Sequence, residues 1–272
     1  MSLFISTNLY EPEQLADIFL LLEKIDDKSV GIELFPEWQS EAFCRLVAEY
    51  SGAFRQRPSS LHGPYYGTEH SKERGTEEYA KALDYFRQTL ALARALSSKY
   101  IVFHHNNCRV EPAGRLRMIK AATENLRELR REAKSFNIPL VIENAGVLPR
   151  GNVLFDEPQF IAMAQNEPEN ILLDVGHAHA NGWDLQRVME KLAHKIVAYH
   201  VHNNYQQEDN HNRIFDGTLD FVRFLAWYNR YTPQADIVIE YGRQCGRDAD
   251  GICQDIAYIK RALGQAGRAI TM

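Results

Sequence analysis

The chain has 272 residues, of which 45% are hydrophobic, 25% charged and 11% aromatic. This is the composition of a globular protein that can bury a sizeable core, so a largely disordered chain is excluded. Its 31 basic and 36 acidic residues give a formal net charge of −5, which provides no overall positive field to attract nucleic acid or an anionic membrane.

The cysteines and the N-terminal segment indicate the cellular setting. Cys44, Cys108, Cys245 and Cys253 form no CxxC pair, so the sequence predicts neither a zinc knuckle nor a disulfide framework. No basic stretch precedes an apolar one at the N-terminus, and no run of 18 apolar residues occurs. We therefore expect a soluble, cytoplasmic protein that does not interact with a membrane.

In chain order, the sequence contains eight short apolar runs, which predict strands. They span residues 3–7, 30–35, 59–65, 100–105, 139–145, 171–177, 196–202 and 236–242. Longer amphipathic segments separate them, such as 78–98 and 115–136, which predict helices. The apolar stripe of the second segment consists of Leu116, Ile119, Ala122, Leu126 and Leu129.

Strand-like runs that alternate with helices are typical of parallel sheets with crossover helices. Eight units of about 34 residues predict an α/β fold, a single (β/α)8 TIM barrel that occupies residues 1–272 as one domain. A doubly wound open sheet is the rival fold. It would usually carry a glycine-rich turn after its first strand, and residues 6–13 contain no glycine.

Six of the predicted strands end in a side chain that can bind a metal. These side chains are His62, His104, Glu143, Asp174, His202 and Glu240. Barrel enzymes place their chemistry at this end of the strands, where several buried carboxylates together are costly unless a cation neutralises them. Carboxylates with imidazoles and no thiolate suit Zn²⁺, Mn²⁺, Fe²⁺ or Co²⁺, so the sequence predicts one such divalent ion.

Each of these residues also has a structural interpretation. A single histidine is often only hydrogen-bonded, Asp174 could cap the following helix, and Glu240 could pair with Arg243. The convergence of six residues on one rim favours the metal.

Further polar residues follow the strands. His177 and His179 come after Asp174, and Asp209 and His211 form a D-x-H step after His202. A loop of this kind could bring two more ligands to the rim. The aromatic side chains Phe35, Trp38, Tyr65 and Tyr66 could either line a pocket or pack under loops. The sequence contains no GxSxG elbow, P-loop or HExxH motif.

Together these segments resemble the xylose isomerase-like TIM-barrel superfamily, which includes ketose 3-epimerases, inosose-processing enzymes and endonuclease IV. The resemblance runs from GIELF (31–35) through HGPY, VFHH, LVIEN, LLDVGHAH and HVHNN to VIEYG (238–242). By this resemblance the metal ligands are Glu143, Asp174, His202 and Glu240. In the epimerases the two matching glutamates move a proton on and off the substrate carbon, and His177 would hydrogen-bond a substrate oxygen.

The chain also resembles endonuclease IV in a larger ligand set, which implies two or three ions. His62, His104 and Glu143 would hold one ion. Glu143, Asp174, His202 and Glu240 would hold a second, and His177, Asp209 and His211 a third. Such a set suits phosphate-ester hydrolysis.

Other features oppose a nuclease. The His-Pro-Gly-Ser turn of endonuclease IV is replaced by His104-His105-Asn106-Asn107, and the loop after His202 has little basic character. The epimerase pattern is also incomplete, because Glu208 stands where an arginine meets the substrate; Arg213 could serve instead.

The sequence thus favours a divalent-metal-dependent isomerase or epimerase that acts on a small sugar, polyol or keto-sugar in carbohydrate metabolism. The alternatives are an endonuclease IV-like multinuclear phosphoesterase and a barrel that binds a ligand without turnover. We expect a small carbohydrate-like substrate rather than nucleic acid as the partner. Nothing in the sequence indicates the oligomeric state.

Overall fold

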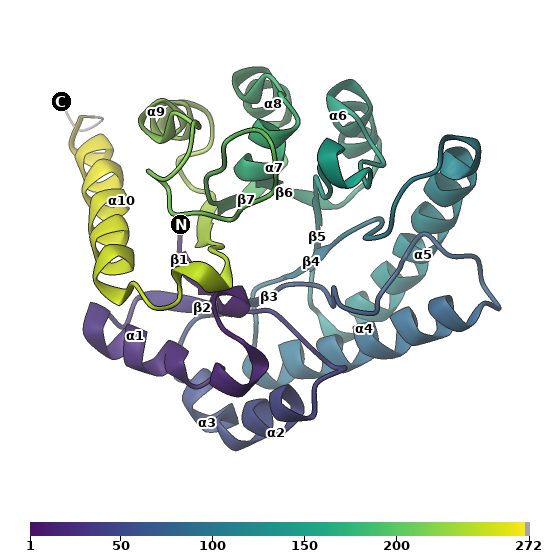
Figure 1. Ribbon diagram of the computed structural model, residues 1–272, viewed down its shortest axis with the longest axis horizontal. Helices are drawn as coiled ribbons and strands as arrows, with labels where there is room; N and C mark the ends of the chain where they lie inside the picture. Colours follow the sequence, from purple (N-terminus) through teal and green to yellow (C-terminus); the bar gives the residue numbers. More distant parts are fainter. Residues whose placement is uncertain (270–272) are drawn as a thin grey trace.

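The computed structural model describes residues 1–269, and each of the eight predicted runs contributes one strand to a closed parallel barrel (Figure 1). This confirms the (β/α)8 architecture. The strands follow one another around the barrel in sequence order. They are β1 (Leu3–Ser6), β2 (Val30–Leu34), β3 (Ser59–Leu61), β4 (Ile101–Phe103), β5 (Leu140–Glu143), β6 (Asn170–Asp174), β7 (Ile196–Val201) and β8 (Asp236–Ile239).

Helices surround the strands on the outside of the barrel (Figure 1). They are α1 (Asp17–Ile25), α2 (Glu41–Glu49), α3 (Ser51–Phe54), α4 (Glu77–Leu96), α5 (Arg115–Phe136), α6 (Glu157–Asn166), α7 (Val175–Ala180), α8 (Leu185–Leu192), α9 (Phe221–Tyr231) and α10 (Ala249–Ala269). Short 3-10 turns follow several strands, at Thr7–Leu9, Pro12–Gln14, Pro112–Gly114, Leu148–Arg150 and Arg243–Cys245. No helix within residues 1–269 is both long enough and apolar enough to span a bilayer.

The barrel has two hydrophobic cores. The larger lies between the strands and the helices, and a smaller one contains Tyr100, Val102, Val141, Leu172 and Ala198. Side chains two residues apart on a strand point to the same side. Val141 and Leu172 therefore share a side with Glu143 and Asp174, as the alternation predicts, and the small core fills the barrel beneath these carboxylates.

Two local expectations are wrong in detail. The run 171–177 is a strand only to Asp174, because the Asp174 carboxylate accepts a hydrogen bond from the His177 backbone N–H (2.6 Å) and starts α7 there. Leu116, expected on the buried stripe, is 80% exposed. It lies in the first turn of α5, whose buried face begins at Ala121. The four cysteines are free.

Candidate metal centre and active-site cavity

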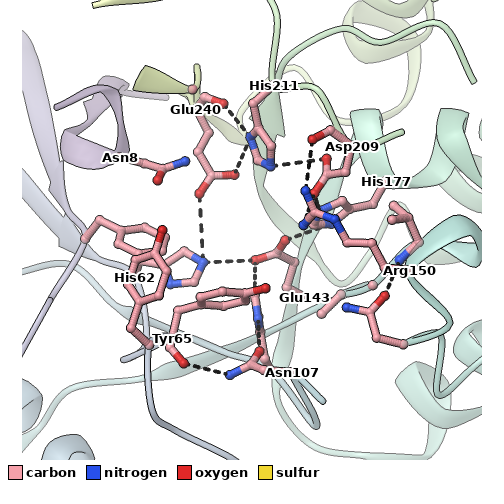
Figure 2. A pocket seen from close by; sticks show the side chains of 18 of the residues that line it. Asn8, His62, Tyr65, Asn107, Glu143, Arg150, His177, Asp209, His211 and Glu240 are labelled. Atoms are coloured by element: carbon pink, nitrogen blue, oxygen red, sulfur yellow. Dashed lines mark hydrogen bonds and ion pairs between the residues drawn. The ribbon is translucent and has the colours of Figure 1, made fainter. Parts of the chain in front are cut away.

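A cavity of about 280 Å³ lies at the carboxyl ends of the strands, where barrel enzymes keep their active sites (Figure 2). Phe35, Tyr65 and Tyr66 form an aromatic part of its wall. Trp38 lies outside the lining and donates a hydrogen bond from Nε1 to Thr89 Oγ1 (2.8 Å). The sequence left both roles open for these aromatic residues. In the structure three of them line the cavity, and Trp38 packs against the hydrophobic core.

Glu143 and Glu240 line the cavity, and together with Asp174 and His200 they form a central group. His200 Nδ1 lies 3.3 Å from Glu143 Oε2, 3.3 Å from Glu240 Oε2 and 3.8 Å from Asp174 Oδ2. All four side chains are buried. The in-register pairing of Asp174 with His200 on β6 and β7 sets these two residues at the same height in the barrel.

A second set, the β3–β4 group, consists of His62, His104 and Glu143. Both histidines follow directly on their strands. His104 Nε2 is 2.8 Å and His62 Nε2 is 3.7 Å from Glu143 Oε2. Glu143 thus belongs to two groups, and its carboxylate is shared between them.

A third set, the loop group, consists of His177, His202, Asp209 and His211. Asp209 lies 3.3 Å from His177 Nε2 and 3.2 Å from His211 Nε2, and the rings of His202 and His211 stack with their centres 3.8 Å apart. His211 has a positive φ of 49°, which few residues other than glycine adopt. The loop therefore folds back over the rim, as the D-x-H spacing predicts.

Several of the histidines are held from outside by a backbone or amide oxygen. His62 Nδ1 donates to Gly63 O (2.6 Å), His104 Nδ1 to Asn107 Oδ1 (3.0 Å) and His211 Nδ1 to Glu240 O (2.8 Å). In each ring the other nitrogen then faces the carboxylates. Metal-binding histidines in proteins are oriented in this way.

The buried charges of the site are not balanced by arginine or lysine. Among the described residues, Arg150 makes the one such ion pair within the groups, with Nη1 3.2 Å from Asp209 Oδ2. The other carboxylates and the imidazoles instead shift one another's pKa values. Burial opposes the charged imidazole of His211, but Asp209 and Glu240 outweigh burial and raise the pKa of His211 to about 9. Burial, together with the charges of Glu143 and Asp174, raises the pKa of Glu240 to about 7.

The donor atoms fit divalent transition metals. Five buried polar atoms of the three groups make no hydrogen bond within the described part of the chain: Glu143 Oε1, His177 Nδ1, His200 Nδ1, His202 Nδ1 and Asp209 Oδ1. Buried polar atoms normally have partners, so these atoms are available to a cation. Oxygen and imidazole donors without sulfur suit Zn²⁺, Mn²⁺, Fe²⁺ or Co²⁺.

The structure brings together every residue that the sequence proposed for the site. These residues are His62, His104, Glu143, Asp174, His177, His202, Asp209, His211 and Glu240. Asp174 caps α7 and also faces the groups, so both of its interpretations apply. The metal-binding and catalytic roles of these residues remain predictions.

Other polar residues have different roles. His179 lies outside the three groups and forms a hydrogen bond with Thr218 (2.9 Å). Arg213 does not line the cavity and pairs with Asp255. Arg243 Nη2 lies 2.6 Å from Glu37 Oε1, so Arg243 pairs with Glu37 and not with Glu240.

Sequence reasoning missed three residues of the site. His200 is on β7, two residues before His202, and the period-2 alternation of side chains along the strand is the signal that would have found it. Arg150 and Arg243 also line the cavity. They lie several residues after the ends of β5 and β8 and belong to no recognisable sequence motif.

The fold and the site together define a (β/α)8 barrel with a cluster of histidines and carboxylates at its mouth that could hold a metal ion. Residues 17–262 match the family described as "Xylose isomerase-like TIM barrel", and the chain belongs to this family.

Similar proteins have been described. The uncharacterized protein MJ1614 of Methanocaldococcus jannaschii is 25% identical over 229 residues, which cover 82% of this chain and 86% of that protein. The crystal structure of a D-tagatose 3-epimerase-like protein superposes with a TM-score of 0.78 at 17% identity, over 99% of this chain and 100% of the other. The IOLI protein with a bound zinc atom gives 0.76 at 15% identity, over 98% and 99%. At these identities the two structures show the shared fold.

Proposed function

We propose that the protein is a divalent-metal-dependent isomerase or epimerase that acts on a small sugar, polyol or keto-sugar. The observation that supports this most is that two buried glutamates, Glu143 at the end of β5 and Glu240 directly after β8, both line a small cavity. His62 Nε2 lies between them, 3.7 Å from Glu143 Oε2 and 3.9 Å from Glu240 Oε1. The cavity is of the size that suits a small ligand rather than a polymer.

Two carboxylates on different sides of a substrate carbon can act as base and acid. One removes the proton from the carbon and the other returns a proton on the opposite face. A divalent ion in the central group would polarise a carbonyl and its neighbouring hydroxyl and so make the C–H bond more acidic. His177 lines the cavity and would hydrogen-bond a substrate oxygen, and Phe35, Tyr65 and Tyr66 would offer apolar faces to a sugar ring.

The names of the similar structures support this choice, since one is epimerase-like and another contains zinc. Solvent isotope exchange tests the proposal. The metal-loaded protein is incubated in D2O with a panel of ketoses and inososes, and deuterium incorporation is followed by NMR. We expect exchange at the carbon next to the carbonyl. Glu143→Gln and Glu240→Gln should each lower the rate by about 10²–10³-fold at saturating metal.

A second candidate is phosphate-ester hydrolysis by several ions. The loop group favours it, because proton transfer at one ion does not require the four additional donors His177, His202, Asp209 and His211. The same preparation is therefore incubated with phosphomonoesters and with an abasic DNA duplex. Release of phosphate or cleavage of the duplex, without isotope exchange, would replace the isomerase proposal with this one.

A further inference from the structure

Glu33 is a buried carboxylate of the barrel interior that the proposed chemistry does not use. It lies on β2, is fully buried and does not line the cavity. Its two oxygens have different partners. Oε2 accepts a hydrogen bond from Ser60 Oγ (3.0 Å), and Oε1 lies 2.7 Å from His200 Nε2. Burying a carboxylate costs free energy. A buried carboxylate whose two oxygens both have polar partners therefore calls for a functional explanation.

The contact with Glu33 determines which nitrogen of His200 carries a proton. A carboxylate oxygen accepts hydrogen bonds, so the 2.7 Å contact assigns His200 Nε2 as the donor to Glu33 Oε1. In the neutral ring this leaves the lone pair on Nδ1, the atom that lies 3.3 Å from both Glu143 and Glu240. Glu33 thus aims the donor atom of His200 at the centre of the central group.

We propose that Glu33 is a positioning residue that holds His200 as a ligand of the ion in the central group. This inference rests on the metal-dependent function proposed above. By contrast, the ring of His202, which follows β7, has Nε2 3.1 Å from Asp174 Oδ2, a carboxylate of the central group itself. His200 is therefore the histidine of β7 that is oriented from outside.

The charge of Glu33 distinguishes it from the other acceptors that hold histidines in the site. His62, His104 and His211 donate to backbone or amide oxygens, which are neutral. A carboxylate partner makes the imidazole a stronger electron donor toward a cation. Loss of Glu33 should therefore weaken the central ion more than any ion held by the β3–β4 group or the loop group.

Three variants test this inference. Glu33→Ala removes both the charge and the acceptor, whereas Glu33→Gln keeps an acceptor oxygen and removes only the charge. Asp236→Asn is the matched control, since Asp236 is a buried barrel carboxylate that accepts hydrogen bonds from Ser2 N and Lys99 Nζ and does not contact His200. Zn²⁺ affinity is measured by competition with a chromophoric chelator, and bound ions are counted by elemental analysis. Thermal unfolding in EDTA reports the fold.

We expect Glu33→Ala to raise the Kd of one ion by about 10–100-fold and Glu33→Gln to raise it by at least about 3-fold, with Asp236→Asn unchanged. If Glu33→Ala does not fold, Glu33→Gln decides. Wild-type affinity in the folded Glu33 variants would overturn the role of Glu33 and leave the proposed function standing. A wild-type protein that binds no Zn²⁺, Mn²⁺ or Co²⁺ would overturn both.

Discussion

Stabilisation by metal should depend strongly on Glu143, because this carboxylate contacts members of all three groups. It lies 2.8 Å from His104 Nε2, 3.2 Å from His177 Nδ1 and 3.3 Å from His200 Nδ1. At a metal concentration of 100 Kd, one bound ion stabilises the wild-type protein by about 2.7 kcal/mol. Unfolding entropy of about 2.1 cal/mol/K per residue over 272 residues converts this into a rise in Tm of about 5 °C.

Glu143→Gln removes one charge and one shared ligand oxygen. If this raises the Kd about 100-fold, the same metal concentration contributes only about 0.4 kcal/mol, and the rise in Tm falls below about 1 °C. The assay is thermal unfolding by circular dichroism, with and without Zn²⁺ or Mn²⁺.

The matched control for Glu143→Gln is Asp255→Asn. Asp255 is another buried carboxylate, held outside the barrel by Arg213 and Tyr241. This variant should unfold at a lower temperature in both conditions but keep the full metal-induced rise. A full 5 °C rise in Glu143→Gln would refute the idea that this carboxylate is a shared metal ligand.

Three further changes have defined outcomes. His211→Ala should remove one ion by elemental analysis and leave the central ion bound; unchanged stoichiometry would make the Asp209–His211 step structural. Gly176→Ala would place a Cβ 2.0 Å from the His202 ring, so this ring must shift, and we expect about 1–3 kcal/mol lower stability by urea unfolding. Burial lowers the pKa of His70 from 6.5 to about 4 in the folded protein. As the pH falls, His70 therefore takes up its proton in the unfolded chain before it does so in the folded protein. Stability should therefore drop by about 2 kcal/mol between pH 7 and pH 5 through this residue, and His70→Leu should lose that part of the slope; an unchanged slope would contradict the assignment.

The strand order and the rim of the barrel are readable from local patterns. Each strand is a short buried run, and period-2 alternation places Val141 beneath Glu143 and Leu172 beneath Asp174 without any knowledge of the fold. Closure follows from counting eight such units of equal length. The end of β6 was less readable, because the apolar run continues into α7 and only the cap formed by Asp174 ends the strand.

By itself, the sequence determined that nine metal-capable side chains follow the strands of one barrel, since strand ends and residue types are local properties. It did not determine how these side chains divide into groups. His200 is on β7 and His202 directly follows this strand. Only the register between β6 and β7 sets His200 level with Asp174, while His202 stacks on His211. The partnership of Glu33 with His200 joins residues 167 positions apart in the chain. Such contacts are decided by barrel closure and shear, which bring β2 and β7 face to face across the interior, and no local pattern encodes that geometry.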